Sequence, residues 1–264
     1  MRTALVTGGS SGIGAAYADR LARRGHPLIL VARRVDRLEA VAERLRREFG
    51  VAVEVFPADL TEPSDLRRVE ERLRSDAEIA MLVNNAGATM RSAIVGTPVD
   101  AMDALVALNV VAVTHLATAA ADAFVERGAG TIVNVSSMVV VGPEKYCGIY
   151  GATKAYVLNF SLSLHGEVAD RGVRVQVLVP GTVRTEIFAR AGKDINAIDP
   201  AMIMEPGDFV DAALAGLDRG EVVTIPSLEH DTWWDDATAA RLRLLPELSR
   251  DRPATRYVNA DALG

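Results

Sequence analysis

The chain has 264 residues, of which 49% are apolar, so it can bury the core of a single domain. Its net charge of −6 argues against nucleic acid or an anionic membrane surface as a partner. The apolar runs have the length of strands rather than the roughly 20 residues of a membrane span, and no cationic and apolar leader precedes the first predicted strand.

Short β-branched segments alternate with longer helical patterns along the chain. We predict strands at 3–7, 27–32, 51–57, 81–84, 130–136, 173–179 and 222–226. The helices are expected between them, at 13–24, 35–49, 63–75, 99–126, 150–170 and 207–218. This alternation is typical of βαβ units, and nearly continuous apolar strands indicate a sheet covered on both faces. The sequence therefore predicts a single-domain α/β fold over residues 1–264, with a doubly wound parallel sheet of about seven strands and helices on both faces.

Two segments depart from this regular alternation. Residues 186–206 are mixed in composition and punctuated by glycine and proline. The segment is either a surface connection or a lid over a substrate, and we favour the lid because ligands bind at the carboxyl ends of strands in open α/β sheets. The C-terminal tail, residues 227–264, contains both tryptophans, Trp233 and Trp234, and an amphipathic stretch at 237–248. We expect this tail to form a docking helix or a subunit contact.

The first predicted strand leads directly into a glycine cluster, Thr7-Gly8-Gly9-Ser10-Ser11-Gly12-Ile13-Gly14. A strand, a glycine turn and a helix in this order direct backbone N–H groups and a helix N-terminus toward a phosphate. A glycine cluster taken alone can be only a tight turn. Its position after the first strand favours a dinucleotide site.

Tyr150 and Lys154 are four residues apart in a predicted helix, so their side chains share one helix face. The ammonium group favours the phenolate, and we expect it to lower the pKa of Tyr150 from its usual value of about 10. The alternative is a solvated surface pair. Only three of the chain's 29 lysines and arginines are lysines. Because the chain otherwise uses arginine, the lysine at position 154 indicates that a compact charge is needed there.

The single cysteine, Cys147, lies three residues before Tyr150. One cysteine excludes an internal disulfide and is compatible with a reducing cytoplasm, where we expect the protein to be located. Cys147 is expected to line a substrate pocket as a small apolar group. No cluster of His, Cys, Asp and Glu has the spacing of a metal site, so we expect no metal ion.

These motifs belong to a longer ordered series. After the glycine cluster come Asp59-Leu60, Asn84-Asn85-Ala86-Gly87, Asn109, Ser137, Tyr150, Lys154 and Pro180-Gly181-Thr182-Val183-Arg184-Thr185. Over residues 3–226 the chain resembles the short-chain dehydrogenase/reductase family. The resemblance implies a Rossmann-type sheet with strand order 3-2-1-4-5-6-7, and hydride transfer between a nicotinamide cofactor and a small-molecule carbonyl or secondary alcohol. It also implies a homodimer or homotetramer, paired through helices 99–126 and 150–170.

The resemblance assigns catalytic roles to Asn109, Ser137, Tyr150 and Lys154. Tyr150 would exchange a proton with the substrate oxygen, and Ser137 would hydrogen-bond the same atom and orient it. Lys154 would also bind the cofactor ribose. Asn109 would lie at a helix irregularity that holds a water near the lysine, whereas a solvent-facing asparagine is the alternative.

The resemblance also implies cofactor contacts at several strand ends. They are Gly8, Ser10, Ser11, Gly12, Ile13, Gly14, Arg33, Arg34, Asp59, Leu60, Asn85, Ala86, Gly87, Tyr150, Lys154, Pro180, Gly181, Val183 and Thr185. Asp59 could accept a hydrogen bond from the adenine amino group or serve as an acid at a helix N-terminus, and the two roles are compatible. Thr185 and the backbone of Val183 are expected to contact the nicotinamide carboxamide.

The end of the second strand distinguishes the two nicotinamide cofactors. In NAD-preferring members of the family an acid at this position binds the ribose hydroxyls. Here the position holds Ala32, followed by Arg33 and Arg34. Alanine does not repel a 2′-phosphate, and Arg33 can bind one in a bidentate manner; the alternative is that both arginines are only solvated. We therefore predict NADP(H) in preference to NAD(H).

The substrate is not fixed by these motifs, because the family acts on many carbonyl compounds with one catalytic set. Two further functions are alternatives to an enzyme: a regulator that binds the cofactor without turnover, and a structural subunit of a larger complex. The complete set of four catalytic residues speaks against the regulator.

Overall fold

The computed structural model describes residues 1–264 except 91–93, 146–147, 193, 231 and 259–264. The chain divides into two compact units, Met1–Pro226 and Ser227–Gly264. The division falls at the residue where the tail was expected to begin.

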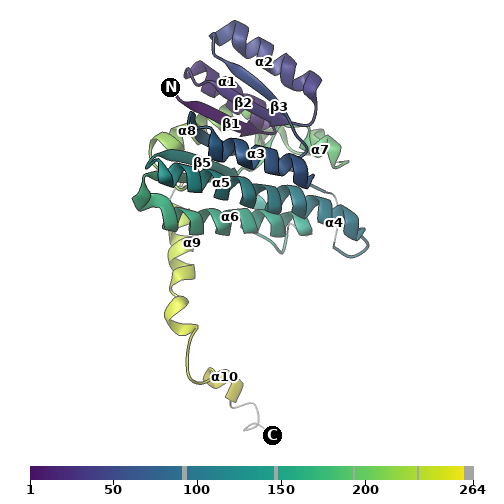
Figure 1. Ribbon diagram of the computed structural model, residues 1–264. Helices are drawn as coiled ribbons and strands as arrows, with labels where there is room; N and C mark the ends of the chain where they lie inside the picture. The colour runs from purple at the N-terminus through teal and green to yellow at the C-terminus, as the bar shows by residue number, and fades with distance from the viewer. Residues whose placement is uncertain (91–93, 146–147, 193, 231, 259–264) are drawn as a thin grey trace. The chain divides into compact units, whose positions relative to one another are not determined.

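The first unit is built on a parallel sheet, part of which is labelled in Figure 1. In this sheet the described residues contribute seven strands in the order β3-β2-β1-β4-β5-β6-β9. Their bounds are β1 Thr3–Thr7, β2 Leu28–Ala32, β3 Val53–Pro57, β4 Ile79–Asn84, β5 Gly130–Val135, β6 Val173–Leu178 and β9 Val223–Thr224. The seventh strand is numbered β9 because β7 (Thr182–Val183) and β8 (Ile203–Met204) pair with each other outside this sheet. The predicted fold class and strand order are confirmed.

Helices cover both faces of the sheet. One face carries α1 (Gly12–Arg23), α2 (Val35–Phe49) and α8 (Pro206–Asp218). The other face carries α3 (Pro63–Ser75), α5 (Val113–Glu126) and α6 (Ile149–Val168), which lie side by side in Figure 1. Apart from α5, which forms only the second half of the helix predicted at 99–126, each of these helices begins and ends within two residues of its predicted range, because its apolar positions recur with helical spacing.

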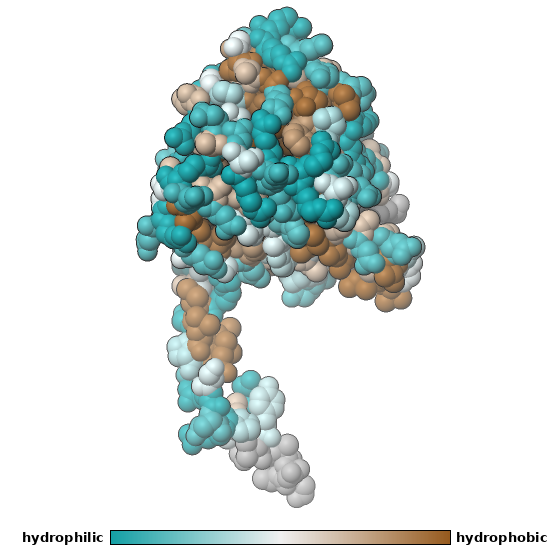
Figure 2. All heavy atoms as spheres, in the orientation of Figure 1, coloured by the Kyte–Doolittle hydropathy of each residue, from teal (hydrophilic) through white to brown (hydrophobic). Residues whose placement is uncertain are grey.

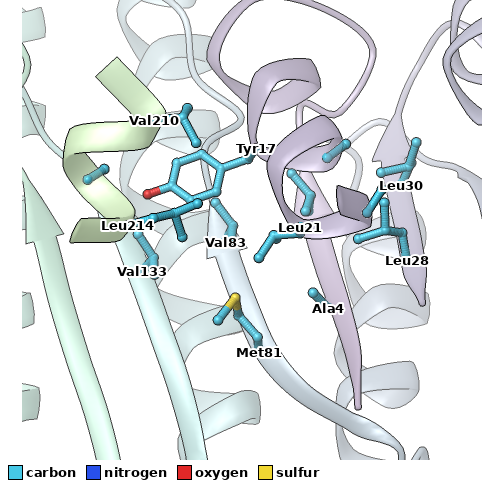
Figure 3. Packing of buried hydrophobic residues seen from close by; sticks show 14 of the residues in the cluster. Ala4, Tyr17, Leu21, Leu28, Leu30, Met81, Val83, Val133, Val210 and Leu214 are labelled. Carbon is cyan, nitrogen blue, oxygen red and sulfur yellow. The ribbon is translucent and has the colours of Figure 1, made fainter. Parts of the chain in front are cut away.

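The core on the α1 side is shown in Figure 3, where Tyr17 of α1 packs against Val210 and Leu214 of α8. Along β1, Ala4 and Val6 join this core whereas Leu5 joins the core on the other face, as the alternation of side chains in a strand requires. Full burial of each large apolar side chain contributes about 1.5–3 kcal/mol. The two cores together fix the strand ends that form the site.

The helix after β4 is long and interrupted by a wider turn. It consists of α4 (Val99–Val106), a π-helical turn at Ala107–Ala112 and α5. The 28 residues of Val99–Glu126 have a window of mean hydropathy 1.8, so length and composition alone would allow a membrane span. Half of that window is buried inside the protein, as in a packed core helix. The expectation that all apolar runs are of strand length is therefore wrong for this segment.

The second unit contains α9 (Thr232–Leu242), a 3₁₀ turn at Leu245–Glu247 and α10 (Thr255–Val258). The helix α9 begins and ends about five residues before the predicted amphipathic stretch. None of the described residues of this unit is buried. Figure 2 shows hydrophobic side chains on its surface, and the large exposed ones are Trp233, Leu242, Leu244, Leu245, Leu248 and Tyr257.

Candidate active site

A cavity of about 1190 Å³ lies at the carboxyl ends of the strands. Its lining brings together the glycine cluster after β1, the arginines after β2, the ends of β3 to β6, and the start of α6. Every predicted site residue lines this cavity except Gly14 and Asn109. Among the described residues no group of three or more His, Cys, Asp and Glu side chains could hold a metal ion.

The glycine cluster forms a tight loop between β1 and α1. Gly8 and Gly12 have φ values of +67° and +53°, a backbone region that favours glycine. A Cβ on Gly14 would lie 2.2 Å from the carbonyl oxygen of Gly8, so Gly14 lets the helix pack against the loop. The residues present therefore fit a dinucleotide phosphate, with backbone N–H groups and the N-terminus of α1 facing the cavity.

Asn85 and Thr7 join the end of β4 to this loop. The Asn85 side chain donates to the Thr7 carbonyl at 2.9 Å, and the Thr7 hydroxyl accepts from the N–H groups of Asn85 and Ala86 at 3.0 Å each. These bonds place the predicted adenosine-contacting turn beside the phosphate loop.

The side chain of Lys154 is buried next to the ring of Tyr150, the candidate general acid. Its Nζ donates to the Val135 carbonyl at 2.8 Å and lies 5.9 Å from the centre of the Tyr150 ring. Burial lowers the pKa of Lys154 to about 8, because an ammonium group loses hydration in the interior. The side chain is only partly charged above neutral pH, and it reaches Tyr150 through the face of the ring.

Tyr150 and Ser137 both line the cavity, and their side chains are joined by a hydrogen bond. Burial raises the pKa of Tyr150, and a hydrogen bond with the Ser137 side chain opposes that rise. The expectation that the pKa of Tyr150 lies below its usual value is wrong for this structure, because the loss of hydration outweighs the opposing hydrogen bond with Ser137. Tyr150 therefore keeps its proton at neutral pH.

The two neighbouring serines point to different partners. The Ser136 hydroxyl donates to the Lys154 carbonyl at 2.7 Å inside the protein. Ser137 lines the cavity and is 7% exposed. Because successive side chains point to opposite sides of an extended backbone, Ser137 lies beside Tyr150 whereas Ser136 makes a structural contact.

Asn109 lies in the π-helical turn, fully buried. Its Oδ1 accepts from the N–H of Ala88 at 3.0 Å, and its Nδ2 donates to the Ala88 carbonyl at 2.9 Å and to the Thr153 hydroxyl at 3.1 Å. The solvent-facing alternative is wrong, and the helix irregularity implied by the family is present. Asn109 ties the loop after β4 to α6, one residue before Lys154; its contact with a water stays a prediction.

At the nucleotide end, Asp59 forms a local turn after β3. Its Oδ1 accepts from the N–H and hydroxyl of Thr61 at 3.0 and 2.7 Å, and its Oδ2 lies 3.7 Å from Arg33. Burial opposes the charged form, but the bonds from Thr61 and the charge of Arg33 hold the pKa of Asp59 below its usual range. Asp59 precedes α3 by four residues, and it lines the cavity together with Arg33.

Several cavity residues were not among the predicted site residues. Some follow the strands β4 and β5, such as Met90, Met138 and Val139, and those in the segment 186–206 are Glu186, Ile187, Phe188, Arg190, Gly192, Asp194 and Ile198. The segment was predicted to lie over the substrate, but no spacing in it identifies which side chains face inward. Cys147, expected to line the pocket, lies outside the described residues.

The chain matches the family model described as short chain dehydrogenase over residues 2–196. The chain belongs to the short chain dehydrogenase family. It is accordingly an oxidoreductase, as predicted. Among its curated relatives is a very-long-chain 3-oxoacyl-CoA reductase-like protein of Arabidopsis thaliana, 33% identical over 88% of this chain and 74% of the relative. The rat 17-beta-hydroxysteroid dehydrogenase type 3 is 34% identical over 69% of this chain and 60% of its own length, so the chain spans less than two thirds of that relative.

Solved structures of the family are similar over nearly the whole chain. A short-chain dehydrogenase from Sphingobium yanoikuyae in complex with NADPH is 49% identical, covers 97% of this chain and 100% of its own, and has a TM-score of 0.94. A bulky-bulky ketone specific alcohol dehydrogenase from Comamonas testosteroni is 44% identical, covers 97% of this chain and 98% of its own, and has a TM-score of 0.90.

Proposed function

We propose that the protein is an NADP(H)-dependent reductase of ketones that carry bulky apolar groups, with Tyr150 as the general acid. The observation that carries this proposal is the placement of Ser137, Tyr150 and Lys154 on one wall of the cavity that the phosphate loop also lines. When bound, the nicotinamide supplies the hydride that converts the carbonyl carbon to an alcohol carbon.

The side chains supply the proton and the orientation. Ser137 and Tyr150 donate hydrogen bonds to the carbonyl oxygen, which gains electron density as its carbon accepts the hydride. The Tyr150 proton passes to that oxygen and leaves a phenolate. Lys154, 5.9 Å from the ring centre, stabilises this negative charge. Because burial raises the pKa of Tyr150, the residue is protonated at neutral pH and can donate the proton that carbonyl reduction requires.

The preference for NADP(H) rests on the end of β2. Ala32, Arg33 and Arg34 all line the cavity, and no acid stands among them to repel a 2′-phosphate. Arginine binds phosphate through paired, charge-assisted hydrogen bonds. The NADPH complex of the similar Sphingobium protein supports the same choice.

The substrate class rests on the large apolar side chains of the cavity lining. Among them are Met90, Val139, Ile187, Phe188 and Ile198, beside the polar Thr89, Lys145 and Asp194. Such a surface binds large apolar substituents by removing their surface from water. The bulky-bulky ketone specificity named for the Comamonas enzyme supports this class. In this proposal the segment 186–206 closes over the substrate.

The direct test follows oxidation of NADPH, and separately of NADH, by the purified full chain. The substrates are a ketone with two aryl groups, acetone, and a small aldehyde. We expect turnover of the diaryl ketone with NADPH and a much lower kcat/KM for acetone. Absence of turnover with every compound would support the regulator instead, and equal use of acetone would reject the bulky substrate class.

We further propose a cytoplasmic homo-oligomer, paired through the outer surfaces of α5 and α6. A shallow groove there is lined by residues of both helices, including Ala121, Val125, Phe160 and Leu164. Light scattering at micromolar concentration is expected to give a dimer or tetramer mass; a mass of 28.2 kDa would contradict this assembly.

A further inference from the structure

Three arginines converge on one carboxylate at the edge of the cavity. Arg37 Nη1 lies 2.8 Å from both oxygens of Glu186, Arg190 Nη2 lies 2.6 Å from Oε2, and Arg34 Nη2 lies 3.7 Å from Oε2. We call these four residues the arginine cluster. Arg34 and Arg37 come from the start of α2, whereas Glu186 and Arg190 (on α7, Ile187–Arg190) come from the segment 186–206.

The arginine cluster has more positive charge than Glu186 can neutralise. Three guanidinium groups and one carboxylate leave a formal charge of +2, and a carboxylate has room for about one fully bidentate guanidinium. The side chains of Arg34, Arg37, Glu186 and Arg190 are 46%, 37%, 47% and 51% exposed. Exposed ion pairs of this kind are weak and exchange partners readily. A doubly charged anion would compete effectively for these arginines.

The arginine cluster lies against the phosphate loop. Arg190 Nη2 is 3.4 Å from the Ser11 hydroxyl, and a Cβ on Gly12 would lie 3.0 Å from the methyl group of Thr185, the residue before Glu186. Ser11, Arg34, Glu186 and Arg190 line the same cavity. An anion held between the loop and the end of β2 is therefore within reach of groups from both α2 and α7.

We propose that Arg37 and Arg190 complete the binding site for the cofactor's adenosine 2′-phosphate, and that Glu186 is the counter-ion that the phosphate displaces. The inference rests on the proposed function, and it adds residues that the end of β2 alone does not provide. The Glu186 charge opposes binding of the phosphorylated cofactor, because it both occupies the arginines and repels the incoming phosphate. Glu186 thereby sets how strongly NADP(H) is preferred.

The test measures ligand binding by calorimetry on the full chain, without turnover. The ligands are 2′,5′-ADP, which carries the 2′-phosphate, 5′-AMP, which lacks it, and ADP, which carries a pyrophosphate. Arg37→Ala and Arg190→Ala are each expected to weaken 2′,5′-ADP binding by about three- to tenfold, with 5′-AMP and ADP within about twofold of wild type. Glu186→Gln is expected to tighten 2′,5′-ADP binding by about threefold.

Two matched controls remove the same charges elsewhere. Arg47→Ala removes an arginine from the other end of α2, and Glu205→Gln removes the carboxylate that pairs with Arg184 at 2.6 Å. Neither is expected to change the ratio of 2′,5′-ADP to 5′-AMP affinity. Retained 5′-AMP binding in every variant shows that the phosphate loop is folded.

Each contrary result has one meaning. If Arg190→Ala weakens ADP as much as 2′,5′-ADP, Arg190 is a pyrophosphate ligand and the inference is overturned. If Glu186→Gln weakens 2′,5′-ADP, the carboxylate pre-positions the arginines and its proposed role is wrong. If wild type binds 2′,5′-ADP no more tightly than 5′-AMP, the NADP(H) assignment fails together with this inference. If wild type binds 2′,5′-ADP more tightly but no variant changes the ratio of the two affinities, only this inference fails.

Discussion

At the catalytic end of the cavity polar side chains are buried and bonded to the backbone, whereas at the nucleotide end charged side chains are exposed and bonded to one another. Lys154 and Asn109 are 5% and 0% exposed, and they bond to the carbonyls of Val135 and Ala88. Glu186 and Arg37 are 47% and 37% exposed at their side chains.

This difference in burial matches two requirements of the reaction: catalytic groups that stay in place, and cofactor-binding groups that can change partners. A buried polar group that loses its partner costs about 1–3 kcal/mol, so the catalytic groups stay in place through the proton transfer. An exposed ion pair contributes at most about 1 kcal/mol, so the nucleotide end can exchange its partners when a cofactor phosphate arrives. The following variants test each side of this comparison.

Among the variants that leave the proton donor Tyr150 itself intact, the largest effect is expected at Lys154. Lys154→Met keeps the length of the side chain but removes the charge that stabilises the Tyr150 phenolate. We expect kcat for ketone reduction to fall by about 10²–10³, within the range of general acid–base catalysis. Lys154→Arg serves as the charge-retaining comparison. A kcat within tenfold of wild type in Lys154→Met would contradict the role given to this charge.

The burial of Lys154 also predicts how stability depends on pH. Burial lowers its pKa from 10.5 to about 8 in the folded protein, so between these values the unfolded chain binds more protons. Stability from this group therefore rises as pH increases from about 8 toward 10.5 and is lost as pH falls through about 8. The free energy of unfolding of wild type, measured relative to that of Lys154→Met by denaturant unfolding, should therefore increase by up to about 3 kcal/mol between pH 7 and pH 10. A difference that is independent of pH would show that the ammonium is hydrated.

At the exposed nucleotide end, we expect substitutions to change the selectivity between NADPH and NADH without unfolding the protein. In Ala32→Asp/Arg33→Ala a carboxylate replaces the methyl group beside the 2′-phosphate site, and one phosphate ligand is removed. We expect the ratio of kcat/KM for NADPH to that for NADH to fall by about ten- to a hundredfold. Arg47→Ala is the control. Equal use of both cofactors by wild type would reject the prediction before the variant is made.

The smallest effect concerns a buried polar group without a partner. The Tyr17 hydroxyl lies in the α1 core with no hydrogen-bond partner among the described atoms, and burial raises its pKa. Tyr17→Phe keeps the ring and should leave the free energy of unfolding unchanged or raise it by about 1 kcal/mol. Tyr156→Phe, which removes a 2.8 Å contact with the Thr114 hydroxyl, is the matched control and should not stabilise. Destabilisation by Tyr17→Phe would mean that this hydroxyl has a partner, such as a buried water.

Three residues of the catalytic end, Ser137, Tyr150 and Lys154, could be predicted from the sequence because local geometry places them. Tyr150 and Lys154 share a helix face through a spacing of four residues, and Ser137 lies two residues after the buried strand β5. Apolar periodicity likewise predicts the main helices and strands, since burial on one or both faces dictates it.

The nucleotide end could be predicted only in part. The arginines after β2 are visible in the sequence, but the contact of Arg37 with Glu186 joins residues 149 positions apart, and no local pattern encodes such a pair.

At the catalytic end, the raised pKa of Tyr150 was missed for a similar reason, because it depends on burial by the folded chain rather than on the neighbouring lysine. The π-helical turn at Asn109 has no signal in hydrophobic periodicity, and only the family resemblance implied it.

The central claim is that Tyr150 gives the proton in an NADPH-dependent ketone reduction. The most direct measurement compares wild type with Tyr150→Phe, which retains the buried ring and deletes the proton. The account predicts that kcat/KM for a diaryl ketone falls by about 10²–10⁴, while the dissociation constant for NADPH stays within about threefold of wild type. Reduction by Tyr150→Phe at the wild-type rate, with NADPH bound equally well, would contradict the account.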